Sequence, residues 1–259
     1  MKLTQIRNAT LVLDYAGKKF LIDPMLAEKE AWDGFAGNAR PHLRNPMVAL
    51  PVTVESLLSA DAVILTHTHT DHWDEAAQQV IPKEKVIYTQ NEHDAALVRS
   101  QGFLNVRVLK EENAFVDGLT IYKTDGQHGS NDLYADPLWG DLLGDACGLV
   151  FTHPDEKTLY IAGDTVWVKP YVRSLQRFQP DVVVLNTGYA VNDLYGPIIM
   201  GKEDTLRTHK MLPEATIVAS HMESINHCLL TRAELREFSL EHGIQDKVLI
   251  PADGETMAF

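Results

Sequence analysis

Residues 66–72 read THTHTDH and bring three histidines and one aspartate into seven positions. They follow a short apolar run at 62–65, which we expect to form a buried strand. The chain has only 11 histidines, so three in one polar turn are hard to explain as solvated imidazoles alone. Neutral imidazole and carboxylate are suitable ligands for zinc, manganese and iron, and the stretch therefore indicates a metal site.

The spacing inside this stretch predicts two ions rather than one. In an extended segment, residues two apart project from the same face, so His67 and His69 can share one ion. A turn after His69 would direct Asp71 and His72 towards a second ion. The stretch contains no cysteine, which argues against a purely structural zinc.

Three further ligating side chains follow predicted strands. His128 stands in DGQHGSN after the predicted strand 119–124, Asp164 in YIAGDTV, and His221 in IVASHME. Alone, each has an ordinary interpretation as a loop histidine or a turn aspartate. Together with THTHTDH they make four places where ligating side chains follow a predicted strand. Loops at strand ends are where a rigid scaffold can hold catalytic groups.

The organisation of the chain predicts two sheets covered by helices. A hairpin is expected over 10–24, strands and helices alternate from residue 61, and hairpins with turns at 117–118 and 153–155 occupy the middle. Helices are then expected over 170–178, 203–212 and 232–242, and strands over 182–185, 216–219 and 248–251. Two segments, 27–52 and 131–148, show no periodicity and are expected to be irregular. No linker divides the chain, so we expect one α/β domain spanning 1–259.

Composition restricts the partners. The 23 basic and 36 acidic residues give a net charge of −13 without any Lys/Arg block, which disfavours nucleic acid. The two cysteines, Cys147 and Cys228, are far apart, which is typical of a reducing compartment. Neither a signal peptide nor an apolar run of the ~18–20 residues needed to cross a bilayer is present, so we expect a cytoplasmic protein without membrane contact. A homo-oligomer is left open.

The His-x-His-x-Asp-His motif at 67–72, followed by His128, Asp164 and His221, resembles the metallo-β-lactamase-fold hydrolases. The resemblance implies a four-layer αββα sandwich with two divalent metal ions at one edge of the sheets. It also implies that His67, His69 and His128 hold the first ion, and that Asp71, His72 and His221 hold the second. Asp164 would bridge the two ions. Asp23 in LIDP matches a family position beside the site that supports the ligands, with a turn aspartate before Pro24 as the alternative.

Within this superfamily, DGQHG and SHMESINHCLLTR at 220–232 look like the branch that contains ascorbate-6-phosphate lactonase. That narrower resemblance makes Asn226 and His227 candidate pocket residues, with a polar turn before the next helix as the alternative. Arg40 and Arg44, on segment 27–52, are candidates for binding an anionic group of a substrate, although arginines on such loops are often simply solvated.

The expected chemistry is hydrolysis by a metal-bound hydroxide, because a bimetal site lowers the pKa of bound water towards ~7. Asp71 would ligate and orient this hydroxide and accept its proton. We expect a small soluble substrate, a lactone or other ester of an anionic metabolite. A phosphodiesterase or nuclease of the same fold, or a non-catalytic metal-binding protein, remains as the alternative. The ions would be zinc or manganese, with iron as a further option.

Overall fold

Two seven-stranded sheets form the centre of the protein, whose computed structural model describes residues 1–115 and 118–259. Across the first sheet the strands are β16 (Thr256–Ala258), β1 (Lys2–Arg7), β2 (Thr10–Tyr15), β3 (Lys18–Ile22), β4 (Ala62–Ile64), β5 (Val86–Thr89) and β6 (Asn105–Val108). Across the second they are β15 (Val248–Leu249), β14 (Thr216–Ser220), β11 (Val182–Asn186), β10 (Leu159–Ile161), β9 (Cys147–Thr152), β8 (Thr120–Asp125) and β7 (Glu112–Ala114).

The sheets face each other across one apolar layer. Leu13 and Ile64 of the first sheet and Leu149 and Val184 of the second are fully buried in this shared cluster. Alternate residues of the strands point the other way, for example Val63 towards the helices. Because side chains alternate along a strand, each strand contributes to two apolar layers at once. This accounts for the near-continuous apolar runs at 62–65 and 182–185.

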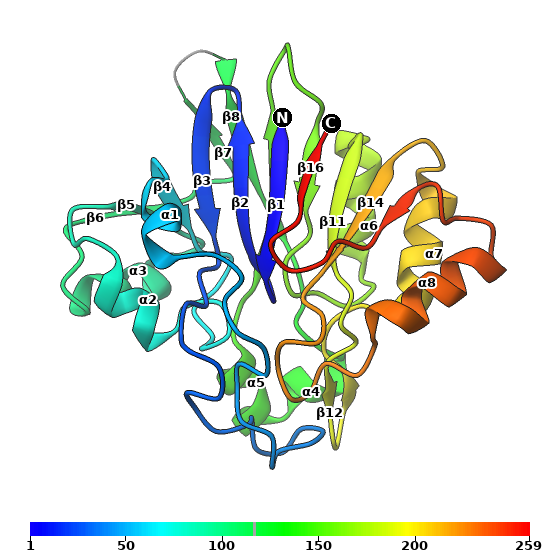
Figure 1. Ribbon diagram of the computed structural model, residues 1–259, viewed down its shortest axis with the longest axis horizontal. Coiled ribbons are helices and arrows are strands. Elements are labelled where there is room, and N and C mark those ends of the chain that lie inside the picture. Colours follow the sequence, from blue (N-terminus) through cyan, green and yellow to red (C-terminus); the bar gives the residue numbers. More distant parts are fainter. Residues whose placement is uncertain (116–117) are drawn as a thin grey trace.

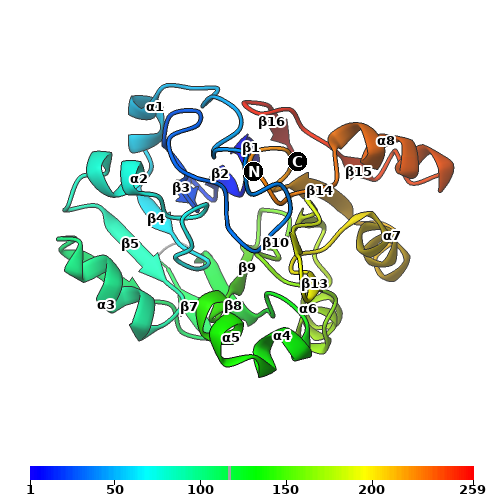
Figure 2. The ribbon, with the colours of Figure 1, turned by 90° about the horizontal axis from the view of Figure 1, so that it is seen from below.

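Helices cover both outer faces (Figure 2). α1 (Val54–Leu58), α2 (Glu75–Val80) and α3 (Glu92–Ser100) pack on the first sheet, and α6 (Lys169–Phe178) and α7 (Lys202–Met211) on the second. α8 (Arg232–Glu241) packs beside β14 through Leu235. The expected four-layer αββα sandwich is therefore confirmed. No helix in the described ranges is both long and apolar enough to cross a membrane.

One end of the sandwich is covered by segments outside the sheets (Figure 1). Segment 27–52 precedes α1 and forms no helix or regular strand in the structure. It lies near α4 (Asn131–Ala135), α5 (Pro137–Leu143) and the small hairpin of β12 (Val191–Asn192) and β13 (Gly196–Pro197). Side chains from all of these segments share one apolar cluster. We call these segments, together with 225–228, the cover.

Several elements differ from the sequence predictions, and α1 is one that was not predicted. Segment 131–148 was expected to be irregular but forms α4 and α5, which begin after the capping side chains Ser130 and Asp136. Hairpin β12–β13 and the last strand, β16, were not predicted, and β16 pairs with β1 at the opposite end of the chain. In the predicted turn at 117–118, residue 117 lies outside the described residues.

Candidate metal centre

The seven side chains named by the sequence converge at one end of the sandwich, where strands of both sheets run out into loops. We call them the ligand cluster: His67, His69, Asp71, His72, His128, Asp164 and His221. The stretch 67–72 follows β4, whereas the other three members follow β8, β10 and β14. Six members are at most 4% exposed, and His69 is partly buried. Three overlapping groups within the cluster have ligand atoms within 4.8 Å of one another.

Asp164 lies at the centre of the ligand cluster. Its Oδ2 is 3.2 Å from Nε2 of both His72 and His128. The same oxygen is 3.6 Å from His221 Nε2 and 3.9 Å from His67 Nε2. One carboxylate oxygen therefore faces histidines from both proposed halves of the cluster, which is the geometry that a bridging ligand needs.

Partners outside the cluster fix which nitrogen of each imidazole points inwards. His128 donates its Nδ1–H to the carbonyl of Ile198 at 2.8 Å, and His69 donates its Nε2–H to the carbonyl of Leu142 at 3.2 Å. The other nitrogen of each ring is left with its lone pair directed into the cluster. Outer partners of this kind orient ligating histidines in metal sites.

Asp23 orients two histidines at once. Its Oδ2 accepts from Nδ1 of His72 at 2.9 Å and from Oγ1 of Thr66 at 2.6 Å. The Thr66 oxygen lies 3.1 Å from Nδ1 of His67, so this hydroxyl links His67 to the same carboxylate. The structure thus places Asp23 beside the cluster, in the position that the resemblance implies.

Two asparagines that sequence reasoning missed hold the two aspartates. Asn186, the last residue of β11, donates to Asp164 Oδ1 at 2.6 Å, which leaves Oδ2 for the histidines. Asn8, between β1 and β2, lies 3.3 Å from Asp71 Oδ2 through Nδ2. Both asparagines are buried. Asparagine is so common at strand ends and turns that neither residue carried a signal in one sequence.

Three residues of the site have a left-handed backbone, and Asn8, with φ 54°, is one of them. Asp23 has φ 46° and His221 has φ 58°, directly after β3 and β14. This conformation costs about 1–2 kcal/mol for a residue with a Cβ, so the surrounding structure must enforce it. After this sharp bend the His221 side chain lies in the cluster and the Asp23 side chain contacts His72.

The charges of the cluster favour a cation at its centre. Burial would raise the pKa of Asp164, but His72 and His221 hold it well below the usual carboxyl range, and His72 has the same effect on Asp71. Burial alone would lower the pKa of His72, yet Asp164, Asp71 and Asp23 raise it to about 10. By contrast, burial lowers the pKa of His69 to about 4, which keeps it neutral. Buried carboxylates and imidazoles, which lose their protons when a metal binds, form a donor set that fits divalent metal ions.

A cavity of about 250 Å³ opens beside the ligand cluster. His69, Asp71, His128 and Asp164 line its polar end. Ile198 and side chains of the cover line the rest. Those of the cover are Phe35, Asn38, Trp139, Leu142, Leu143 and His227, of which Asn38 and His227 are polar. Thr68 and Thr70 complete the lining, and no Lys or Arg is among these described residues.

The four candidate substrate-binding residues have different environments. His227 lines the cavity, whereas Asn226, Arg40 and Arg44 do not. Arg40 donates to the carbonyls of Asn226 (2.8 Å) and Cys228, and so holds the backbone on both sides of His227. Arg44 pairs with Asp33 and donates to the carbonyls of Glu30 and Ala31. Neither guanidinium group is directed at the cavity. Arg40 is bonded to backbone carbonyls, and Arg44 is bonded to backbone carbonyls and to Asp33.

Asn226 connects the cover instead of lining the cavity. Its Oδ1 accepts from the backbone N–H of Phe35 at 3.0 Å and from Nδ2 of Asn45 at 2.9 Å. Its Nδ2 donates to the carbonyl of Ala39 at 2.8 Å. Segment 27–52 is therefore fastened to residue 226 by one buried amide.

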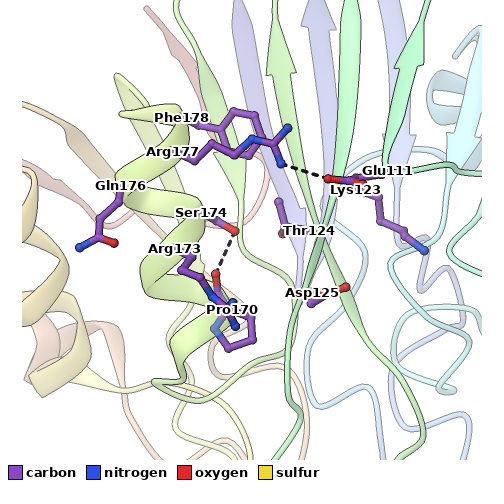
Figure 3. A pocket seen from close by; sticks show the side chains of 10 residues that line it. All are labelled: Glu111, Lys123, Thr124, Asp125, Pro170, Arg173, Ser174, Gln176, Arg177 and Phe178. Carbon is purple, nitrogen blue, oxygen red and sulfur yellow. Dashed lines mark hydrogen bonds and ion pairs between the residues drawn. The ribbon is translucent and has the colours of Figure 1, made fainter.

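A more open hollow of about 790 Å³ lies between α6 and β8, with none of the cluster on its walls (Figure 3). Arg177 crosses it to Glu111 at 3.2 Å, and Arg173 and Lys123 add further charges. These side chains are exposed or partly exposed. The smaller cavity is the candidate site, because only there does concave space meet the converging histidines and aspartates.

Comparisons with known proteins identify the family of the chain. A profile of the Beta-lactamase superfamily domain matches residues 18–222. The UPF0173 protein YddR of Bacillus subtilis strain 168 is 46% identical over 260 residues, which cover 100% of both chains. The crystal structure of isothiocyanate hydrolase from Delia radicum gut bacteria has 88% sequence identity and a TM-score of 0.99, covering 100% of this chain and 99% of that one.

A further crystal structure, of a possible metal-dependent hydrolase from Veillonella parvula DSM 2008, has 44% identity and a TM-score of 0.97, again over 100% and 99% of the two chains. The profile match includes the stretch 66–72 and every other member of the ligand cluster. The chain belongs to the Beta-lactamase superfamily domain family.

Proposed function

We propose that this metal-dependent hydrolase of the metallo-β-lactamase fold cleaves small organic isothiocyanates, R–N=C=S, to the amine and carbonyl sulfide. The observation that carries the proposal is the cavity, which joins a polar cluster to a largely apolar wall without any Lys or Arg. An isothiocyanate has the same two parts, a polar reactive end and an apolar substituent. The solved structure at 88% identity is that of an isothiocyanate hydrolase, which supports the same substrate class.

The residues would hold two divalent ions in the arrangement that the family resemblance implies. His67, His69 and His128 would hold one ion, Asp71, His72 and His221 the other, and Asp164 would reach both. Bound ions lower the pKa of water and polarise an electrophile, which is the chemistry that attack on the central carbon needs. Nitrogen and oxygen donors alone fit zinc, manganese and iron.

The chain's own residues would orient the reactants. Asp71 lines the cavity, and Asn8 and His221 fix its carboxylate, so it is placed to accept a hydrogen bond from attacking water. The rings of Phe35 and Trp139, with Leu143 and Ile198, would surround the substituent and exclude bulk water. A cavity of about 250 Å³ lies just below the ~300–1,000 Å³ usual for drug-sized ligands, so a small substituent is expected.

The cavity favours a neutral substrate over the anionic metabolite expected from sequence. An anionic group needs a fixed cationic partner beyond the metals, and Arg40 and Arg44 are engaged elsewhere. A neutral lactone would still find a place beside the cluster. A phosphodiester would bring its charge against an apolar wall.

A panel matched for shape tests this proposal. The metal-loaded protein should release benzylamine and carbonyl sulfide from benzyl isothiocyanate, measured by chromatography and headspace analysis. The 4-carboxybenzyl analogue should react at least ~10-fold more slowly, because its charge would be desolvated without a partner. Faster hydrolysis of γ-phenyl-γ-butyrolactone, or of bis(4-nitrophenyl) phosphate, would contradict the proposal.

A further inference from the structure

His227 lies in the cavity wall and belongs to the loop between β14 and α8. It is 6% exposed, and its ring packs edge-on against Phe35 with centroids 4.9 Å apart. Of the titratable residues described in the cavity lining, it is the one outside the ligand cluster. A buried imidazole beside the reacting groups, without a place in the cluster, needs an explanation.

The hydrogen bonds around His227 indicate which nitrogen faces the cavity. Nδ1 lies 3.5 Å from Oδ1 of Asn226. That atom accepts from Phe35 and Asn45, so it is the amide oxygen, and a protonated Nδ1 is the tautomer that suits this long contact. Nε2 has no hydrogen-bond partner among the described residues. It is also not one of the fully buried side-chain atoms that lack a partner, so it is open to the space beside it. Since His227 lines the cavity, Nε2 presents its lone pair there.

We propose that His227 is a catalytic residue whose Nε2 carries protons from the attacking water to the nitrogen of the substrate. The inference rests on the proposed isothiocyanate hydrolysis and assigns a proton carrier to it. His227 lines the same cavity as Asp71 and Asp164, so its free nitrogen faces the space where the reacting atoms must lie.

The reaction needs two proton transfers from oxygen to nitrogen. In the first step the water oxygen bonds to the central carbon, the C=N π bond breaks, and its electron pair goes to nitrogen. Nε2 takes one proton from the oxygen and gives it to that nitrogen, forming R–NH–C(=S)–OH. In the second step the C–N bond breaks, and the remaining O–H proton moves by the same route to nitrogen. The products are R–NH₂ and O=C=S, so water and isothiocyanate are fully accounted for.

A carrier is needed because oxygen and nitrogen are bonded to the same carbon. A direct transfer would pass through a strained four-membered ring, whereas an imidazole within hydrogen-bond reach of both atoms avoids it. Burial lowers the pKa of His227 to about 4, so the resting ring is neutral and keeps a lone pair on one nitrogen. Asp71 and Asp164 act in the opposite direction, whereas His221 and His128 lower the pKa further.

The test compares the metal-loaded wild-type protein with His227→Ala and His227→Gln. Both variants should keep the wild-type metal content, measured by elemental analysis. Their kcat for benzyl isothiocyanate should fall about 100-fold or more, with KM changed by less than about threefold. Free imidazole should restore part of the rate of His227→Ala, because that substitution leaves space open to the cavity, but not that of His227→Gln. His42→Gln, an exposed histidine on segment 27–52, is the matched control and should keep full activity.

The outcomes separate this inference from the proposed function. Wild-type protein that releases no benzylamine would overturn both together. Wild-type release with undiminished kcat in both variants, or with a rise in KM alone, would overturn the role of His227 only. Nitrogen-15 NMR of His227 gives a readout without turnover, since Nδ1 should be protonated and Nε2 not. The reverse tautomer would also overturn the inference.

Discussion

The cavity has two sides that are built in different ways. The ligand cluster stands on strand ends of both sheets, and most of its side chains have a defined outer partner, such as Asp23 for His72. The cover consists of loops and short helices that pack through an apolar cluster. Its polar anchors, Asn226 and Arg40, hold backbone and not substrate. The comparison teaches that the sheets position the ligating side chains, whereas the cover and Ile198 line the rest of the cavity and touch the metal centre chiefly through the carbonyls of Leu142 and Ile198.

The strongest test of the cluster side is Asp164→Asn. It removes the charge at the centre of four histidines, so we expect loss of metal and a fall in kcat of at least ~1,000-fold, while the fold survives on its apolar layers. Elemental analysis, turnover and circular dichroism measure these effects. Asp246→Asn, at an exposed position, is the control. Retained metal together with retained activity would mean that Asp164 does not bridge two ions.

Asn186→Ala should have the next largest effect. The variant keeps every member of the ligand cluster but frees Asp164 Oδ1, so the carboxylate can rotate away from the histidines. We expect metal affinity to fall about 10–100-fold, as for other partners of ligating groups, measured by competition with a chelator. Asn105→Ala removes an exposed asparagine–carbonyl bond as a control. Unchanged affinity would reduce Asn186 to a structural residue.

The two sides also differ in what the sequence could predict. All seven cluster residues were named in advance, because ligating residue types follow strands and the stretch 66–72 is dense in them. The cover was not predicted, since its contacts join residues as far apart as Phe35 and Asn226 and show no local periodicity. Helices α4 and α5 are too short for a periodic pattern, and only Ser130 and Asp136–Pro137 offered a capping signal. β16 was missed because three residues pair with a strand at the other end of the chain.

On the cover side, Arg40→Ala should have a measurable effect that does not involve the metal. The variant loses charged hydrogen bonds to the carbonyls that flank His227, which we expect to lower the free energy of unfolding by about 1–3 kcal/mol. The loop that carries His227 should loosen, so kcat should fall while metal content stays constant. Chemical denaturation and elemental analysis check both parts. A rise in KM for charged substrates alone would restore the anion-binding role predicted from sequence.

Trp139→Ala should change selectivity rather than rate. The Trp139 ring lines the cavity and packs on Gly37, where a Cβ would lie 2.8 Å from it. Removing the ring should reduce the preference for benzyl over ethyl isothiocyanate by about tenfold in kcat/KM, with metal content unchanged. Leu138→Ala, on the same helix and 73% exposed, should leave the preference intact. An equal loss for both substrates would indicate a damaged site and not a specificity wall.

The smallest effect is expected for Arg44→Ala, and it makes the comparison sharpest because Arg40 lies only four residues away. Both arginines are on segment 27–52, and sequence alone gave them the same role. Arg44 and its partner Asp33 are both exposed, and an ion pair of this type contributes at most about 1 kcal/mol. We therefore expect unchanged kcat, KM and metal content, and a change of less than about 1 kcal/mol in the free energy of unfolding.

Measuring both arginine variants with benzyl and 4-carboxybenzyl isothiocyanate separates two roles for these arginines, support of the cover backbone and recognition of an anionic substrate. If only Arg40→Ala loses activity, and does so with both substrates, the role of Arg40 is to hold the backbone of the cover in place. A shared loss in both variants that is limited to the charged substrate would show that segment 27–52 recognises anions.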